Sequence, residues 1–394
     1  MALRNISLVS RSSVVATATT NGAGSQYVIE TPGGVLYVFF VSNSVLLYVK
    51  STDSGKTWSA QTQITAKTTI MRFSVWYDRW SNISAGLIHC AYNDTATDTT
   101  TYRTVDTENS DTLSTETIMF DGASTANGGT MSICRARGGN VYCATMIDAG
   151  AEGGFFRLPN ANVPNGAWDV ARTTVFEAAT QDQILLVPGW SADNQDMMAF
   201  YWDADADEIS RKIYDDGDNT WAETSIAATM ADVAATSSYP HFAAAVDLTN
   251  SQNLLVAWSA VDTVDADLRC WAVTEGTITE TSTNVVQNSV DDQGLCAISI
   301  DSLDKWHVFY FGKSDGTETY NPAVSLYQKT TTDSGATWSD EVVISTPMAP
   351  DFLMTAPRTS LAVPPCISAN TWNIGVVFSH YFIRQPTISL RLGM

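Results

Sequence analysis

A strongly apolar, aromatic-rich segment recurs along this chain, and no other feature of the sequence limits the fold as much. Each copy follows a strand of small residues and precedes a polar loop, a third strand, a turn and a fourth strand. Apolar residues alternate with period 2, and helical periodicity is almost absent. Seven copies are recognised, at residues 35–42, 87–94, 140–148, 196–205, 253–262, 305–314 and 372–381.

Four strands per repeat, at a spacing of roughly fifty to sixty residues, are typical of a β-propeller. The last repeat, within 355–394, offers only three strands, whereas a strand within residues 1–20 has no repeat of its own. Pairing that strand with the last repeat would close the ring and remove an exposed sheet edge. We therefore predict one all-β domain over 1–394, a β-propeller of four-stranded blades. Seven blades are expected, with six as the alternative.

Two nearly identical turns lie far apart, at 50–61 (KSTDSGKTWSAQ) and 330–341 (TTTDSGATWSDE). Both match the pattern S/T-x-D-x-G-x-T-W/F, and the chain thereby resembles the BNR/Asp-box repeat propellers of the sialidase-like superfamily. The aspartate can cap N–H groups of its own turn, the glycine gives backbone freedom, and the indole is expected between neighbouring sheets. The residues expected to build these turns are Asp53, Gly55, Thr57, Trp58, Asp333, Gly335, Thr337 and Trp338.

Weaker echoes of the same turn occur at 214–223 (YDDGDNTWAE) and 163–171 (VPNGAWDVA). The first has one residue too many between its glycine and threonine, and the second keeps only the glycine and the tryptophan. Both fall where the turn between third and fourth strands of a repeat is expected. The resemblance implies that these turns lie on the face opposite the ligand site.

The resemblance also implies how an enzyme of this kind would hold its substrate. Sialidases bind a carboxylate with three arginines, because guanidinium groups pair bidentately with planar anions. The first lies in an Arg-Ile-Pro motif, but Val28, Ile29 and Glu30 occupy the aligned positions here. No triad is recognisable among the other arginines at first-strand positions, Arg72, Arg135 and Arg358. No acid/base carboxylate or nucleophile pair is found either, so sialidase activity is not expected.

The loops expected between second and third strands are strongly acidic, and a D-x-D-x-D run supplies the oxygen ligands of calcium sites. We interpret them as solvated hairpin tips, with Ca²⁺ binding as the alternative and no other cofactor expected. Glu208 and Tyr214 stand where an EF-hand has its glycine and last carboxylate. The candidate metal ligands are Asp203, Asp205 and Asp207, followed by Asp262, Asp265 and Asp267.

The segment 75–80 (VWYDRW) gathers aromatic side chains and an arginine at a strand end. Exposed aromatic rings can pack on the faces of sugars. We favour a structural role, with Trp76 in the core and Trp80 over a seam between blades, above a glycan-binding platform. The residues of the candidate platform are Trp76, Tyr77, Arg79, Trp80 and, elsewhere in the chain, Trp190.

The six cysteines have no CxxC spacing, which argues against a zinc site or a disulfide framework. A two-residue turn at Gly138–Gly139 would place Cys134 opposite Cys143, at a separation that a disulfide can span. Two buried thiols are the favoured interpretation, with the disulfide as the alternative. The four histidines are expected as buried residues of apolar strands, without ligand spacing: His89, His241, His307 and His380.

The formal net charge is −21, with 42 acidic and 21 basic residues. Such a surface repels nucleic acid and anionic lipid, so neither partner is expected. The longest apolar run, 35–41, is far shorter than the ~20 residues that a membrane helix needs. The N-terminus has no continuous apolar stretch typical of a signal peptide.

These observations favour a non-catalytic propeller over an enzyme. Composition and the lack of a signal peptide suggest a bacteriophage virion protein, on the head or tail, that decorates the particle or binds host surface glycans. Partners would then be other virion proteins or glycans, and an oligomer is compatible with this. The alternatives are a glycoside hydrolase or lyase of the sialidase-like propeller type, and an extracellular or cytoplasmic repeat protein with a cellular partner.

Overall fold

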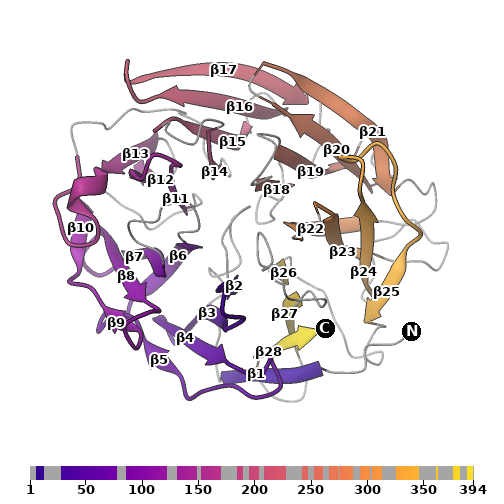
Figure 1. Cartoon of the computed structure of the whole chain (residues 1–394). Coiled ribbons are helices and arrows are strands. Elements are labelled where there is room, and N and C mark those ends of the chain that lie inside the picture. The colour runs from indigo at the N-terminus through magenta and orange to yellow at the C-terminus, as the bar shows by residue number, and fades with distance from the viewer. Residues whose placement is uncertain are drawn as a thin grey trace.

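The computed structural model arranges antiparallel sheets around a ring, with the first strand of each sheet innermost (Figure 1). Its described strands form seven sheets, so the all-β propeller predicted from the sequence is confirmed. Whether each sheet is one complete blade stays a prediction. The structure describes residues 6–12, 28–77, 86–121, 131–148, 152–169, 184–189, 195–203, 208–227, 242–246, 253–260, 266–274, 276–286, 293–301, 304–312, 325–345, 361–362, 376–381 and 388–393.

The first three sheets occupy the chain from 28 to 162. The first contains β2 (Val28–Glu30), β3 (Leu36–Ser42), β4 (Val45–Ser51) and β5 (Thr62–Gln63). The second contains β6 (Ile70–Tyr77), β7 (Leu87–Asp94), β8 (Thr99–Asp106), β9 (Thr112–Leu113) and β10 (Thr117–Asp121). The third contains β11 (Met131–Arg135), β12 (Val141–Asp148) and β13 (Glu152–Leu158), followed by the 3-10 helix η3 (Asn160–Asn162).

The next three sheets occupy 184 to 345. The fourth contains β14 (Ile184–Pro188), β15 (Met197–Asp203), β16 (Glu208–Asp215) and β17 (Thr220–Ala227). The fifth contains β18 (Phe242–Val246), β19 (Asn253–Ala260), β20 (Ala266–Val273) and β21 (Ile278–Val286). The sixth contains β22 (Gln293–Ile300), β23 (Trp306–Gly312), β24 (Ser325–Thr331) and β25 (Val342–Ser345).

The seventh sheet closes the ring as the sequence predicts. It contains β26 (Leu361–Ala362), β27 (Val376–Tyr381), β28 (Ile388–Gly393) and β1 (Ile6–Ser12). The N-terminal β1 pairs antiparallel with the C-terminal β28, from Ile6 opposite Gly393 to Ser12 opposite Ile388. This pairing covers an edge of the last sheet that would otherwise be open to another chain.

Each recurring apolar segment forms the second strand of its sheet, as β3, β7, β12, β15, β19, β23 and β27. These strands are apolar on both faces because each sheet packs against a neighbour on either side. In β3 and β7 every residue is buried. One apolar cluster joins the first and second sheets, and another joins the second, third and fourth. Each fully buried Val, Leu, Ile or Phe contributes about 1.5–3 kcal/mol to this packing.

The two repeated turns have the same hydrogen bonds. Thr57 donates to Asp53 from its backbone N–H (2.9 Å) and its hydroxyl (2.6 Å), and Thr337 donates likewise to Asp333 at 2.9 and 2.6 Å. The glycines four residues after the initial Ser or Thr, Gly55 and Gly335, have φ of 81° and 90°. Both indoles are partly buried against the apolar clusters of their sheets. The aspartate of each turn thus binds the backbone and the hydroxyl of a threonine in the same turn.

The disulfide considered between Cys134 and Cys143 is not formed, and both thiols are free and buried. The two-residue turn predicted at Gly138–Gly139 is wrong. The Ala136 N–H bonds to the Asn140 carbonyl, so three residues form the loop, and Gly139 takes a φ of 104°. This shifts the register by one residue, and Cys143 lies opposite Ile133 instead. A one-residue shift sends the two thiols to opposite faces of the sheet.

Within the described ranges, no helix combines the length and apolar character that a bilayer span requires.

The repeated turns should make stability depend on pH. Hydrogen bonds, chiefly from Thr57, lower the pKa of Asp53 from 3.8 to about 2, and bonds from Thr331 and Thr337 do the same for Asp333. A carboxylate with a lowered folded pKa stabilises above its unfolded pKa, and loses that effect as pH falls through the folded value. We expect the free energy of unfolding, measured with urea, to fall between pH 4 and 2. The fall should be shallower in the double variant that combines Asp53→Asn and Asp333→Asn. Asp340→Asn, at an exposed aspartate beside the second turn, is the control.

Candidate functional site

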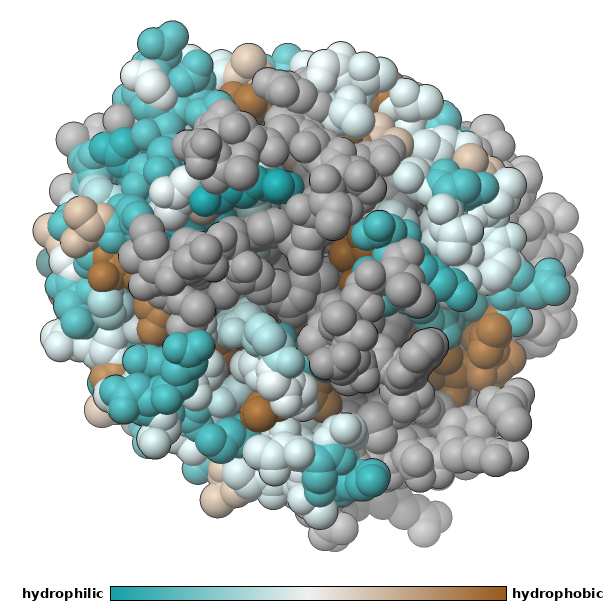
Figure 2. Space-filling view, in the orientation of Figure 1, coloured by the Kyte–Doolittle hydropathy of each residue, from teal (hydrophilic) through white to brown (hydrophobic). Residues whose placement is uncertain are grey.

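The two ends of the ring are chemically different. Hairpins between second and third strands lie at the end where each first strand begins, which we call the hairpin end. Turns between third and fourth strands, including the two repeated turns, lie at the other end, which we call the turn end. Figure 2 shows one face of the ring, where the described residues are mostly hydrophilic or intermediate and hydrophobic patches are small. A ligand site among the described residues of this face would therefore be built mainly from polar groups.

Arg72 is the most unusual polar residue of the hairpin end. It lies near the start of β6, an innermost strand, yet only 6% of its surface is exposed. The pairing of β6 with β7 is irregular between Ile70 and Arg72. The Arg72 N–H bonds to the side-chain oxygen of Asn93 at 2.7 Å. Such bulges turn a side chain away from the direction that regular pairing would give.

The Arg72 side chain lies on the face of the second sheet that packs against the third. Side chains two residues apart share a face of a strand, so Arg72 and Ser74 point the same way. The Ser74 hydroxyl accepts a hydrogen bond from the N–H of Ile133, on β11 of the third sheet, at 3.1 Å. Phe73 and Val75 point the other way, into the cluster shared with the first sheet. Arg72 is therefore placed between two innermost strands.

No described carboxylate neutralises this arginine. Its Nε is buried without a hydrogen-bond partner. Burial alone lowers the pKa of Arg72 to about 10, with no contribution from a neighbouring charge. The guanidinium is still charged at neutral pH. Burying an uncompensated charge costs several kcal/mol, so a group of opposite charge is strongly favoured beside it.

Two further polar groups lie in the same cross-strand row. Asn93 is opposite Arg72, and Thr100 is opposite Asn93 on the next strand. The Thr100 hydroxyl is fully buried and has no hydrogen-bond partner. Side chains directly opposite each other in a sheet are close neighbours. The row thus presents a guanidinium, an amide and a hydroxyl, a set that suits an oxygen-rich anion such as a carboxylate or sulfate.

Asp94, which follows Asn93 in the chain, already has partners of its own. Asp94 accepts hydrogen bonds from the hydroxyls of Thr69 and Thr97 and pairs with Lys67 at 3.5 Å. Burial raises the pKa of Asp94, but these hydrogen bonds outweigh it and the net pKa is lowered. Asp94 therefore holds the hairpin beside the Arg72 row, and its carboxylate pairs with Lys67 instead of Arg72.

The other arginines predicted at first-strand positions do not join this row. Arg135 lies at the turn end of β11, fully buried, and donates to the Gly139 carbonyl (2.8 Å) and the Asn160 side chain (2.7 Å). It therefore has a structural role at the opposite end from Arg72. Arg358 lies outside the described residues. The sequence placed Arg72 on a first strand, but neither the bulge nor the missing counter-charge could be read from it.

Two aromatics named for the glycan-platform alternative, Trp76 and Tyr77, lie in the core, as the favoured structural role predicts for Trp76. Trp76 and Tyr77 are buried, 7% and 5% exposed, and pack into different clusters on opposite faces of β6. Neither ring can therefore stack on a sugar. Arg79, Trp80 and Trp190 lie outside the described residues.

The calcium alternative stays a prediction. Asp203 ends β15, while Asp205, Asp207, Asp262 and Asp265 lie outside the described residues. Asp267 lies in β20. Among the residues that the structure does describe, no group of three or more His, Cys, Asp or Glu is arranged to hold a metal ion.

Fold and site together define a β-propeller with a buried, uncompensated arginine at its hairpin end. No protein-family model and no curated protein matches the sequence. Among solved structures, an ulvan lyase bound to GlcA(1-4)Rha3S is similar over 97% of this chain and 95% of its own, with a TM-score of 0.54 and 10% identity. A prolyl endopeptidase matches 95% of this chain with 47% of its own, at TM-score 0.50 and 10% identity.

The NanB sialidase of Streptococcus pneumoniae is also similar, over 98% of this chain and 70% of its own, with a TM-score of 0.46 and 12% identity. The ulvan lyase and the prolyl endopeptidase, each 10% identical to this chain, show the fold alone, and they are enzymes of different kinds. None of these comparisons points to a virion, so that part of the sequence-based hypothesis stays a prediction.

Arg72→Met should stabilise the protein in buffer without multivalent anions. The substitution keeps much of the side-chain volume and removes an uncompensated buried charge, so we expect a gain of about 1–3 kcal/mol in the free energy of unfolding. Sulfate should stabilise the wild type more than the variant, because only the wild type offers it the guanidinium. Urea unfolding with and without sodium sulfate measures both effects.

Arg103→Met is the matched control on the opposite face of the same sheet. Arg103 donates to the carbonyls of Ser114 and Ile64, both at 2.6 Å, so its removal leaves buried acceptors unpaired. It should destabilise the protein where Arg72→Met stabilises it. A loss of stability in both variants would mean that Arg72 has a protein partner in solution.

Proposed function

We propose that this protein is a carbohydrate-active β-propeller of the lyase or glycoside hydrolase type, which binds an acidic polysaccharide through Arg72. The observation that carries the proposal is the charge of Arg72, which is buried beside an innermost strand without a described counter-ion. A sugar carboxylate or sulfate ester would supply the missing charge. A guanidinium can pair with two oxygens of either group at once.

One of the solved structures that resemble this chain, the ulvan lyase, supports a carbohydrate ligand. The ulvan lyase is described with GlcA(1-4)Rha3S, which contains a uronate and a sulfated sugar. Both anionic groups have the oxygen geometry that a guanidinium binds. The enzyme class also agrees better with these neighbours than the non-catalytic function predicted from the sequence.

The net charge of −21 predicts how the affinity for an acidic polysaccharide depends on salt. A polyanion is repelled by the acidic surface at long range, and salt screens that repulsion over about 10 Å at 0.1 M ionic strength. A buried pair between Arg72 and an anionic sugar is screened much less. Moderate salt should therefore leave the affinity for the polyanion unchanged or increase it. Binding through an exposed basic patch would instead become weaker as salt is added.

Polysaccharides that differ only in charge provide the direct test. We expect the purified chain to bind ulvan and polygalacturonate but not dextran, and to release either unsaturated products, detected by ultraviolet absorbance, or new reducing ends. Arg72→Met should lower affinity on the order of tenfold or more, equivalent to at least about 1.4 kcal/mol. Arg72→Lys, which keeps the charge but loses the planar fork, should retain part of it.

Arg269→Met is the charge-matched control. Arg269 lies on β20 of the fifth sheet, with its Nη1 3.9 Å from the Glu280 Oε1. Its substitution removes the same charge as Arg72→Met from a different sheet. Binding that is unaffected by Arg72→Met would refute the proposed site. Retention of polysaccharide without any cleavage would refute the enzymatic part and favour the receptor-binding propeller predicted from the sequence.

A further inference from the structure

The second and fourth sheets lack the complete repeated turn, but they share a different one. In each, the third strand ends in an aspartate that caps its own turn. Asp106 accepts the N–H groups of Glu108 and Asn109 at 3.1 and 3.2 Å. Asp215 accepts those of Gly217 and Asp218 at 2.8 and 3.1 Å. A second aspartate follows in each turn and is directed elsewhere.

In the second sheet this second aspartate is Asp111, which reaches back to the first sheet. It accepts a hydrogen bond from the Tyr37 hydroxyl at 2.7 Å and pairs with the Lys50 ammonium at 2.5 Å. Tyr37 and Lys50 are directly opposite each other on β3 and β4. Tyr48 adds a longer hydrogen bond of 3.3 Å. Asp111 itself is almost buried by these contacts, with a side chain 9% exposed.

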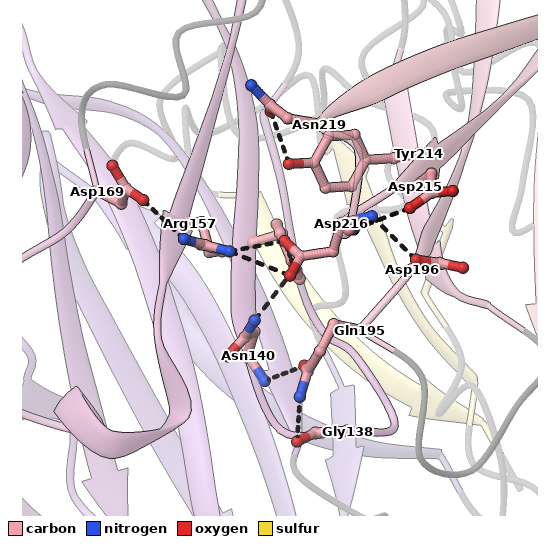
Figure 3. A network of polar contacts seen from close by, with 12 residues as sticks. Gly138, Asn140, Arg157, Asp169, Gln195, Asp196, Tyr214, Asp215, Asp216 and Asn219 are labelled. Carbon is pink, nitrogen blue, oxygen red and sulfur yellow. Dashed lines mark hydrogen bonds and ion pairs between the residues drawn. The ribbon is translucent and has the colours of Figure 1, made fainter.

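In the fourth sheet the second aspartate is Asp216, which reaches back to the third sheet in the same way (Figure 3). Asp216 accepts a hydrogen bond from the Tyr142 hydroxyl at 2.8 Å. One terminal nitrogen of Arg157 donates to both carboxylate oxygens of Asp216, at 2.9 and 3.1 Å. Tyr142 and Arg157 are directly opposite each other on β12 and β13. Asp169 takes the other terminal nitrogen of Arg157 at 2.8 Å.

The two arrangements occupy equivalent positions. Tyr37 and Tyr142 are each the second residue of a second strand, and each basic residue is the cross-strand partner of its tyrosine on the third strand. The carboxylate always comes from the turn of the following sheet. Both tyrosines are buried, and burial together with the aspartate raises the pKa of each, so both hydroxyls stay protonated and donate.

We propose that this tyrosine–base–aspartate lock is a second recurring element of the fold, which holds the first sheet to the second and the third to the fourth as two cooperative pairs. The lock groups lie at the turn end, away from the Arg72 row, so the proposal does not depend on the proposed function. Each lock joins a buried hydroxyl, a cation and a carboxylate across two sheets. Removing the aspartate takes a charged acceptor away from both the tyrosine and the base in a mostly buried place.

Hydrogen exchange of the intact chain, read by mass spectrometry, tests this pairing. Asp216→Asn keeps the shape and removes the charge. We expect exchange to accelerate on the order of tenfold or more in β12, β13, β15 and β16 together, with β3 and β4 unchanged. Asp111→Asn should do the reverse, accelerating exchange in β3, β4, β7 and β8 only.

Matched controls exist within the same turns. Asp218→Asn and Glu108→Gln change an exposed acidic side chain beside each lock aspartate and should leave exchange unchanged. If a lock variant does not fold, Tyr142→Phe removes the hydrogen bond to Asp216 and a longer one from the Asn140 amide (3.3 Å) but leaves the ion pair, and should give the same pattern with a smaller acceleration. Acceleration limited to the mutated turn, or spread evenly around the ring, would overturn the proposal.

Discussion

Inner strands whose burial the structure describes, such as β3 and β7, are buried on both faces, and this constraint governs where polar groups can lie. A polar side chain between two sheets must find a partner there, because water is excluded. The Ser74 hydroxyl meets this demand by accepting the N–H of Ile133 across the seam. The two locks meet it with a cation, a carboxylate and a tyrosine. The Arg72 Nε does not meet it from the described residues, and a buried cation without a described counter-charge makes Arg72 the candidate binding group.

Charge acts on two length scales in this molecule. The large negative charge acts at long range through water and is weakened by salt. The buried guanidinium of Arg72 acts at short range in a place of low dielectric constant, where pairing is strong and selective. An acidic protein can therefore be selective for an acidic ligand, provided that the ligand brings one anionic group into contact with the buried cation. Basic surface patches are not needed.

The sequence predicted those parts of the fold that depend on local pattern. The apolar second strands and the pairing of residues 1–20 with the last repeat both followed from alternation and from counting strands. The hairpin at Cys134 was predicted in the wrong register, because turn composition did not show that Arg137 joins the loop. The candidate site was only partly predictable. Arg72 was found on a first strand, but its isolation depends on the bulge between Ile70 and Arg72 and on the neighbouring sheet.

The same distinction explains why the turn at 214–223 looks like a degraded copy of the repeated turn. A self-contained turn needs residues that are close in sequence, such as Asp53 and Thr57, so a motif identifies it. A lock needs a tyrosine and a base from the preceding sheet, and these are separated from Asp216 by 74 and 59 positions. Its turn keeps an aspartate that caps its own backbone, as Asp215 does, and adds one that reaches outward. The turn at 214–223 therefore departs from the motif because one of its aspartates bonds to the preceding sheet instead of to its own turn.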